Sequence, residues 1–189
     1  MDNRFVAEGT ATPMIPRVGL RMQLSEILND LTYYGRGPEE NYRDRRTSQF
    51  IGEYTTPIKD LYEPYIRPQE NEHRTDIYWC ALTTKQKAGL LFIADRTFEL
   101  NASNYLLGSL DSGETIDNGA PRTNETNHRH LTDPQPVKQV DMFIDYRMMG
   151  VGGDNSWGAM AHEPYLIRPG VENTIESVSY THLRAHETL

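Results

Sequence analysis

The chain has 189 residues, of which 37% are apolar and 24% are charged, which is typical of one domain with a sizeable core. Its formal net charge of -8 argues against nucleic acid as a partner, because phosphate binding needs a basic surface. No apolar run approaches the roughly 18 residues of a membrane span, and a single cysteine, Cys80, excludes an internal disulfide and a cysteine-rich metal site.

The predicted elements of the first hundred residues are mostly strands, in which apolar side chains recur with a period of two. Residues 18–24 alternate between apolar and polar side chains, which indicates a strand with one buried face. Residues 25–31 fit either a short helix or the connection of a hairpin. Residues 89–94 and 97–102 indicate two further strands. A central strand is predicted over residues 76–82, because strict alternation places apolar side chains on both faces: Ile77, Trp79 and Ala81 on one, Tyr78, Cys80 and Leu82 on the other.

In the second half of the chain, Ser103 is a candidate cap for a short helix that extends to Leu110. Residues 111–127 are polar and rich in turn formers, so they predict a long surface loop or an insertion. Residues 140–145 alternate again and predict another strand. Many short strands separated by clusters of Gly, Pro, Asn and Asp are typical of an antiparallel all-β sandwich or barrel.

A glycine-rich stretch follows this last strand and ends in Trp157. Its three glycines, at positions 150, 152 and 153, permit positive φ angles and close backbone approach, so a sharp loop is expected. A tryptophan in such a loop is either a buried anchor or a flat platform for a ligand, and the residues alone favour the anchor. Asp154 and Asn155 could hydrogen-bond hydroxyl groups, although fixing the turn is the favoured interpretation.

Two further stretches carry charged residues. Residues 35–41 lack the ending of a phosphate-binding loop and are interpreted as a structural turn. Within them, Glu39 and Glu40 are neighbours that cannot flank one glycosidic bond in an extended chain, so a solvated charge pair is expected. The surrounding arginines alternate with acidic residues, which predicts salt bridges or a subunit contact; these arginines are Arg36, Arg43, Arg45 and Arg46.

The pair His128 and His130 has a spacing that can bind a metal, and Asp133 lies nearby. A metal site needs further ligands and partners that orient them, and none converges in the sequence. Structural histidines are the favoured interpretation, so no metal site is predicted.

Four stretches together resemble a known family: residues 34–45 (YGRGPEENYRDR), residues 65–76 with YIRPQEN and RTD, residues 128–131 (HRHL) and residues 150–157 (GVGGDNSW). In this order they are similar to the C-terminal small domain, domain 5, of bacterial β-galactosidases of glycoside hydrolase family 2. The resemblance covers about residues 17–175. It implies an antiparallel β-supersandwich, similar to galactose mutarotases, downstream of a catalytic (β/α)8 barrel in a longer polypeptide.

The resemblance also implies a function. The parent enzyme would hydrolyse terminal β-D-galactosides such as lactose by a retaining mechanism, and Trp157 would stack on the sugar. No residue of this chain matches the family's catalytic glutamates or its ligands for magnesium and sodium. The implied partners are a β-galactoside, the other domains and further copies of the parent, in a bacterial cytoplasm. The alternative is a non-catalytic carbohydrate-binding or mutarotase-like sandwich, whose acid and base would come from His73, His128, His130 and Glu70.

The two ends of the chain depart from the family pattern. Residues 1–176 are expected to be a partial, N-terminally truncated copy of the domain. Residues 177–189 resemble a peptide translated from sequencing-adapter DNA and carry no alternating apolar face. This tail is therefore expected to be non-native and to pack against nothing.

Overall fold

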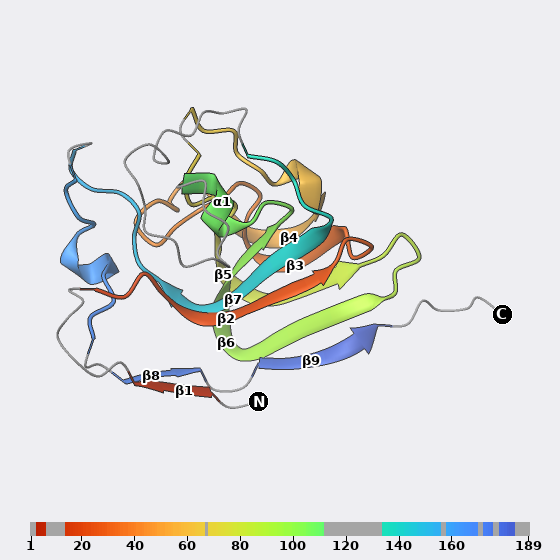
Figure 1. Cartoon of the computed structure of the whole chain (residues 1–189). Helices are drawn as coiled ribbons and strands as arrows, with labels where there is room; N and C mark the ends of the chain where they lie inside the picture. Colours follow the sequence, from red (N-terminus) through yellow and green to blue (C-terminus); the bar gives the residue numbers. More distant parts are fainter. Residues whose placement is uncertain are drawn as a thin grey trace.

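The computed structural model describes residues 3–6, 14–66, 68–111, 134–155, 158–169, 172–175 and 178–183. Its elements are almost all antiparallel strands, joined by loops and three short helices (Figure 1). The strands are β1 (Asn3–Val6), β2 (Arg17–Ser25), β3 (Asp30–Gly37), β4 (Phe50–Pro57), β5 (Arg74–Thr83), β6 (Gly89–Ser103), β7 (Gln139–Met148), β8 (Glu172–Ile175) and β9 (Val178–Leu183). The helices are η1 (Ile58–Asp60), α1 (Leu107–Asp111) and η2 (Glu163–Tyr165). None of the helices in the described part is long and apolar enough to cross a membrane.

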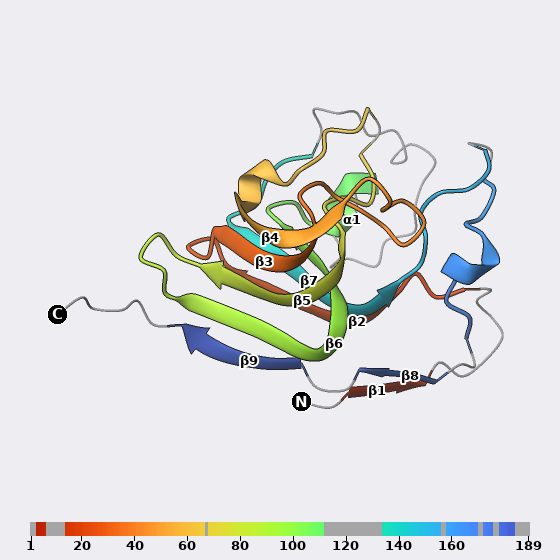
Figure 2. The same cartoon turned by 180° about the vertical axis from the view of Figure 1, so that it is seen from behind.

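One large sheet holds most of these strands in the order β2-β7-β6-β5-β3-β4, and β1 and β8 form a small second sheet. The central strand β6 is long and bent, as Figure 2 shows from behind. It pairs with β5 along one edge. Its other edge is shared end to end by β7, which pairs with residues 99–103, and β9, which pairs with residues 89–94. The prediction of an antiparallel all-β fold is confirmed, whereas the likeness to galactose mutarotases stays a prediction.

The sheet is strongly curled, as the short connection between β2 and β3 requires. These strands are separated by three others, which in a flat sheet corresponds to about 19 Å. The five residue steps from Ser25 to Asp30 reach at most about 18 Å when fully extended. The connection instead contains a turn, in which the Leu28 N–H donates to the Ser25 carbonyl at 3.0 Å. Residues 25–31 are therefore neither a helix nor a hairpin, and both interpretations of this segment were wrong.

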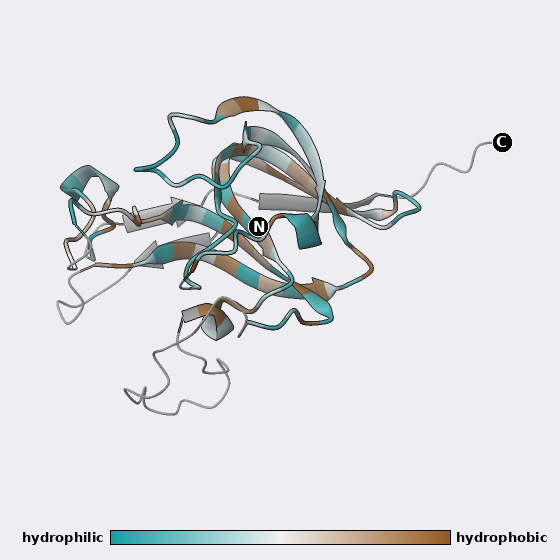
Figure 3. Ribbon diagram, turned by 90° about the horizontal axis from the view of Figure 1, so that it is seen from above, coloured by the Kyte–Doolittle hydropathy of each residue, from teal (hydrophilic) through white to brown (hydrophobic). Residues whose placement is uncertain are grey.

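The hydrophobic core lies inside the curl. Hydrophobic and hydrophilic residues alternate along several strands (Figure 3), and one face of each contributes to the core. Met22 and Leu24 pack against it from β2, as the alternation of residues 18–24 predicts. The buried residues of the core are Leu31, Tyr33, Ile58, Leu61, Ile77, Cys80, Leu82, Phe92, Phe98, Leu100, Ala102, Val140, Met142 and Ile144.

Strand β5 is the predicted central strand, but its alternation is broken. The pairing register with β6 shifts on either side of Ile77, the signature of a bulge. As a result Ile77, Cys80 and Leu82 all reach the core, whereas Tyr78 is 48% exposed. The strict assignment of Ile77 and Cys80 to opposite faces was therefore wrong.

Three other expectations differ from the structure in their details. Residues 89–94 and 97–102 belong to one strand, β6, instead of two. Strands β3 and β4 were not predicted. Strand β3 ends in Gly-Arg-Gly, which is not a typical strand pattern. Gly35 lies there because a Cβ at this position would meet the Ile77 side chain. Ser103 does accept the Tyr105 N–H at 2.8 Å, although α1 begins only at Leu107. Residues 112–127 lie outside the described residues.

The C-terminal tail contains strand β9, and this contradicts the expectation that it packs against nothing. Residues 178–183 pair antiparallel with residues 89–94 of β6, from Val178 opposite Ala94 to Leu183 opposite Gly89. The backbone pairing of an edge does not depend on an alternating apolar pattern, which is why the sequence did not reveal it. The origin of the tail stays a prediction.

Candidate functional site

The glycine loop, residues 149–158, follows directly after β7 and is fixed at its base. The Met149 N–H donates to the Pro16 carbonyl at 2.9 Å, and the Gly150 N–H donates to the Tyr165 carbonyl at 2.8 Å. Pro16 precedes β2, and Tyr165 is the last residue of η2. The base of the loop is therefore held by two segments that are distant from it in the sequence.

Asp44 holds the first half of the glycine loop. Its Oδ2 accepts the Gly152 N–H at 2.7 Å. A Cβ at Gly150 would lie too close to the Asp44 carboxylate and to the Cβ of Tyr165, so a larger residue would displace one of them. The glycine at position 150 thus permits the contact on which the loop depends.

Close approach is also the role of Gly153, where a Cβ would collide with the backbone carbonyl of Ala159. Among the glycines that the structure describes, the positive φ angle belongs to Gly158, at 97°. The expected close backbone approach is confirmed at two of the three glycines, Gly150 and Gly153. A positive φ, which the sequence also allowed for all three, is found elsewhere.

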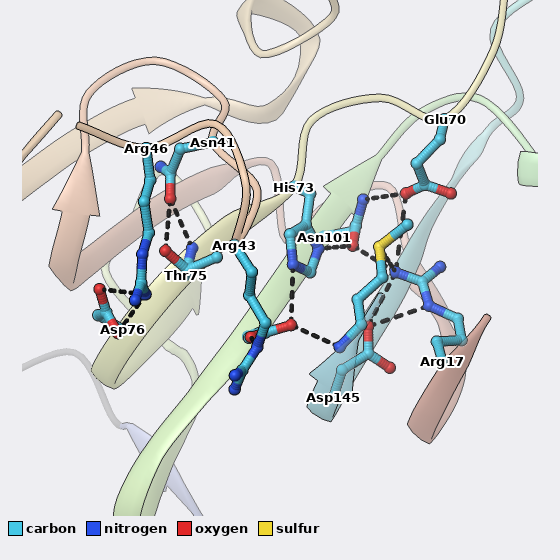
Figure 4. A network of polar contacts seen from close by, with 12 residues as sticks. Arg17, Asn41, Arg43, Arg46, Glu70, His73, Thr75, Asp76, Asn101 and Asp145 are labelled. Atoms are coloured by element: carbon cyan, nitrogen blue, oxygen red, sulfur yellow. Dashed lines mark hydrogen bonds and ion pairs between the residues drawn. The ribbon is translucent and has the colours of Figure 1, made fainter. Parts of the chain in front are cut away.

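A tight turn at residues 41–46 presents Asp44 to the loop. Tyr42 and Arg45 exchange two backbone hydrogen bonds, of 3.1 and 2.8 Å. Asn41 is fully buried, and its Oδ1 accepts both the N–H and the hydroxyl of Thr75, at 3.0 and 2.6 Å. The turn is therefore fastened to the start of β5 (Figure 4).

Glu99, on the central strand β6, links this turn to the glycine loop. One of its oxygens accepts from Arg43 of the turn, and the other accepts the Met148 N–H at 2.6 Å, immediately before the loop. Two segments that are far apart in the sequence thus share one buried carboxylate.

A buried polar network continues from Glu99 beneath the turn (Figure 4). His73 is 1% exposed and contacts Asn101 through Nδ1 at 2.7 Å and Glu99 through Nε2 at 3.1 Å. Arg17 donates to Asn101 at 2.7 Å and forms an ion pair with Asp145 at 2.8 Å. Cations and acids therefore alternate through the network.

Burial and charge act in opposite directions on the pKa values of these groups. Burial alone would lower the pKa of His73, but the hydrogen bond and the charge of Glu99 outweigh it and raise that pKa. Burial would raise the pKa of Glu99, and His73 and Arg43 outweigh it and lower that pKa. Burial raises the pKa of Asp145 to about 6 despite the nearby Arg17. His73 and Glu99 thus stabilise each other's charged forms, as expected of a structural ion pair.

The arginines near the turn form salt bridges, which confirms the first of the two predicted interpretations. Arg36 and Arg46 both bind Asp76, at 2.7 and 2.9 Å, and Arg43 binds Glu99. Arg45 binds Glu40 at 2.6 Å. Residues 35–37 belong to β3, so the predicted turn begins at Pro38.

The expectation for Glu39 and Glu40 was only half right. Glu39 is exposed, as expected of a solvated charge. The side chain of Glu40 is only 6% exposed and accepts hydrogen bonds from the Tyr65 hydroxyl and the Glu72 N–H as well as from Arg45. The two carboxylates therefore differ in environment, and Glu40 is a structural acceptor.

Two of the predicted ligand-binding residues, Asp154 and Asn155, lie in the exposed part of the glycine loop. Asp154 is exposed and pairs with His162 at 2.8 Å, which ties the two limbs of the loop together. Asn155 is exposed. Trp157 lies outside the described residues, so its role stays a prediction.

Other candidates from the sequence are placed less favourably. His128, His130 and Asp133 lie outside the described residues. No group of three or more His, Cys, Asp or Glu side chains within the described ranges could hold a metal ion. Of the four acid and base candidates, His73 is buried and Glu70 is 20% exposed, both contact Asn101, and the other two lie outside the described residues.

Sequence reasoning missed the residues that position the loop, chiefly Asn41, Asp44 and Glu99. The only local signal is that Asn and Asp favour turns. Asp44 and Gly152 are 108 positions apart, and a contact over that distance leaves no mark on either local pattern.

Comparison with known proteins finds a matching family model and several related proteins. A family model described as "Beta galactosidase small chain" matches residues 2–177. A protein named Beta-galactosidase from Priestia megaterium is 33% identical over 162 residues, which are 86% of this chain and 14% of that protein. Proteins of the same name from Vibrio cholerae and Leuconostoc mesenteroides are 32% and 31% identical over 82% and 83% of this chain, and over 13% of each relative. The chain thus spans about 14% of the length of the curated relatives it matches.

Proposed function

The chain belongs to the beta-galactosidase small chain family, and from this premise we propose that it is a segment of a longer β-galactosidase. In that protein it contributes one wall of the sugar-binding site through the glycine loop, and it contributes no catalytic carboxylate. The observation that carries the proposal is the construction of the loop, whose first half is held by Asp44 while residues 151–155 are exposed at the surface.

Trp157 is the residue proposed to touch the sugar. The loop before it is exposed from Val151 to Asn155, and its position is set by the turn at residues 41–46. The apolar C–H face of a pyranose stacks on an indole ring, and such contacts contribute roughly 0.5–1.5 kcal/mol beyond area burial. Asp154, which pairs with His162, and its neighbour Asn155 fix the shape of the turn in this proposal.

The proposed reaction of the longer protein is hydrolysis of terminal β-D-galactosides such as lactose with retention of configuration. It requires one carboxyl group as acid and base and another as nucleophile, about 5–5.5 Å apart across the scissile bond. Three of the four buried acids in the described part of the chain are already engaged: Glu99 with Arg43 and His73, Asp141 with Arg21, and Asp145 with Arg17. This supports a catalytic pair supplied by the rest of the polypeptide.

The remaining parts of the proposal concern the longer protein. Magnesium and sodium ions would be held there by residues outside this chain. The partners would be the other domains and further copies of the enzyme, in the bacterial cytoplasm.

The second candidate function, a non-catalytic carbohydrate-binding or mutarotase-like protein, has less support. It needs an acid and a base that meet at a surface open to substrate. His73 is buried and stacks on the Tyr42 ring at 5.2 Å between centroids, so it does not provide such a surface.

The experiment uses a chimera, in which residues 2–177 replace the matched segment of the Priestia megaterium protein. The chimera is expected to hydrolyse a chromogenic β-galactoside. Trp157→Ala should then weaken the affinity for a competitive sugar inhibitor by several- to tenfold, because stacking is lost. The melting temperature should change little, and Ile66→Ala, at a residue that is 90% exposed, is the control.

Two results would contradict the proposal. If Trp157→Ala leaves the affinity unchanged and lowers the melting temperature by many degrees, Trp157 is a core anchor. If the chimera folds but does not hydrolyse the substrate, the segment does not perform the role of its relatives.

A further inference from the structure

A groove lies at the opposite end of the sheet from the glycine loop, and the proposed function makes no use of it. It is formed around the β2–β3 connection, which lies beside the β5–β6 turn in both Figures 1 and 2. Two adjoining hollows of about 340 and 470 Å³ share Glu26 and Asn29 as walls. We call the first of them the end groove; its other walls are Pro57, Lys59, Asn104, Tyr105, Pro136 and Val137.

Hydrogen-bond acceptors dominate the polar lining of the end groove. Asn29 Oδ1 is buried, and no residue of the described part donates to it. Asn104 donates from its Nδ2 to the Gln139 carbonyl at 3.0 Å. Its Oδ1 can only accept hydrogen bonds. Glu26 adds a carboxylate, which only accepts, and Lys59 is the one cation among the described residues of the lining. A ligand that fits this lining must bring several donors.

An aromatic wall completes the groove. Tyr105 lies in the lining, and its ring stacks on Tyr62 with 4.2 Å between centroids. The Tyr105 N–H donates to Ser103 Oγ at 2.8 Å, so its backbone is fixed as well. A ring held in this way offers an apolar surface next to the acceptors, a combination that suits a pyranose with its C–H face and its hydroxyl groups.

Other classes of small ligand fit less well. An anion would meet the Glu26 carboxylate and the amide oxygens. An apolar molecule would cover the polar side chains of Glu26 and Lys59 without offering them hydrogen bonds, which is costly. The volume of the groove falls in the range of roughly 300–1,000 Å³ that is usual for small-molecule sites. We propose that the end groove is a second binding site, for a neutral saccharide, remote from the glycine loop.

The test is a ligand-observed NMR titration of the full 189-residue chain with galactose and with lactose. Saturable binding is expected in the millimolar range, about 1–10 mM, because the ligand is small and the groove is open. Asn29→Ala should weaken binding about five- to tenfold, since it removes the unsatisfied acceptor. Gln23→Ala, at an exposed position on β2 outside the groove, is the matched control.

Further variants separate this site from the glycine loop and from a folding defect. Trp157→Ala removes any sugar contact of the glycine loop, so binding that persists in this variant belongs to the end groove, and this proposal and the proposed function can fail independently. Circular dichroism checks the fold of each variant. If Asn29→Ala does not fold, the double variant Glu26→Ala with Lys59→Ala tests the proposal instead, because both side chains are exposed and their loss should not disturb the fold. This double variant should weaken binding at least threefold.

Three outcomes would overturn the proposal. The first is the absence of saturable binding of either sugar. The second is binding that survives both groove variants or disappears with Trp157→Ala. The third is inorganic phosphate binding more tightly than galactose, which would make the groove an anion site.

Discussion

Asp44 is the residue through which the glycine loop is joined to the rest of the protein. Its carboxylate accepts the Gly152 N–H and lies against Gly150, while the turn that carries it is fastened to β5 through Asn41. One half-buried side chain therefore helps to set the position of the loop, together with the backbone contacts at its base.

Asp44→Ala should lower the free energy of unfolding by about 1–2 kcal/mol, because the Gly152 N–H loses its acceptor. Asp44→Asn keeps an oxygen and should lose less than half as much. Urea denaturation gives the stability, and hydrogen exchange at the Gly152 amide reports the local contact. Asp60→Ala, at an exposed residue in η1, is the control. Unchanged exchange at Gly152 in Asp44→Ala would show that the contact does not hold the loop.

Glu72 is a second residue with a measurable consequence. It is 1% exposed and has a positive φ of 63°. Burial raises its pKa to about 8, and the partial compensation by Ser103 and Arg74 does not reverse this. In the unfolded chain a glutamate has a pKa near 4.3. Between these values the folded chain holds a proton that the unfolded chain releases, so stability falls as the pH rises from about 4.5 to 8.

Glu72→Gln should remove this pH dependence, because the amide stays neutral. Relative to the wild type, the variant should gain on the order of 1–3 kcal/mol of stability between pH 5 and pH 8. Urea denaturation at both values measures the gain, with Glu53→Gln on the exposed face of β4 as the matched control. A difference between variant and wild type that is the same at both pH values would show that Glu72 does not hold the proton.

The sequence predicted single residues well where both partners lie in one short stretch. Alternating charges around residues 36–46 indicated salt bridges, and Arg45 does pair with its neighbour Glu40. The other arginines of the stretch pair with Asp76 and Glu99, which lie much later in the sequence. The prediction failed for Glu40 as an isolated acid, because the Tyr65 hydroxyl that binds it is 25 positions away. The site depends on such distant pairs, so its geometry could not be predicted.

Among the elements, β9 protects an edge of the large sheet. It covers the part of the β6 edge, residues 89–94, that β7 does not reach. Without β9 this edge would present unpaired N–H and C=O groups, which favour pairing with other chains.

Truncation of the chain after Ser177 should therefore destabilise it, contrary to the expectation from the sequence. The loss should exceed the roughly 0.5 kcal/mol of ordinary surface changes, and the truncated chain should self-associate more readily. Thermal unfolding and light scattering measure the two effects, and amide exchange at residues 89–94 localises them. Removal of residues 184–189 alone is the control. Equal protection of residues 89–94 in both chains would refute the pairing.

The sequence predicted β2, β5 and β7, because these strands alternate or are apolar on both faces. It did not predict β3, whose Gly35 and Gly37 weaken the strand pattern, or the joining of two predicted strands into β6. The bulge at Ile77 depends on the pairing of β5 with β6 and is not visible in the pattern of β5 alone. The local pattern of apolar residues identifies strands, whereas pairing with neighbouring strands determines how long each strand is and which side chains face the core.

At the scale of the whole molecule, the chain is a small share of the proteins it resembles. The matched relatives contribute only 13–14% of their length to the alignment. In the described part of this chain, three of the four buried acids, Glu99, Asp141 and Asp145, are paired with arginine or histidine. This leaves the fourth, Glu72, without a second unengaged buried carboxyl group to form a catalytic pair.

The purified chain should consequently not hydrolyse a chromogenic β-galactoside above a buffer blank. The double variant Glu39→Gln with Glu40→Gln is the control for a contaminating enzyme, whose activity it would leave unchanged. Turnover that survives repurification and is lost in the double variant would show that this chain holds its own catalytic carboxylates.

The pairing of β2 with β7 also sets an order of events in time. Arg17 of β2 lies opposite Met148 of β7, 131 positions later. At a synthesis rate of 5–20 residues per second, β2 emerges from the ribosome roughly 7–26 s before its partner. During this interval Met22 and Leu24 of β2 have no neighbouring strand β7 to pair with. The salt-bridge partners of Arg21 and Arg17, which are Asp141 and Asp145, have not yet been synthesised. The hairpins β3–β4 and β5–β6 can close as they are synthesised, so the first long strand of the large sheet is among the last to join it.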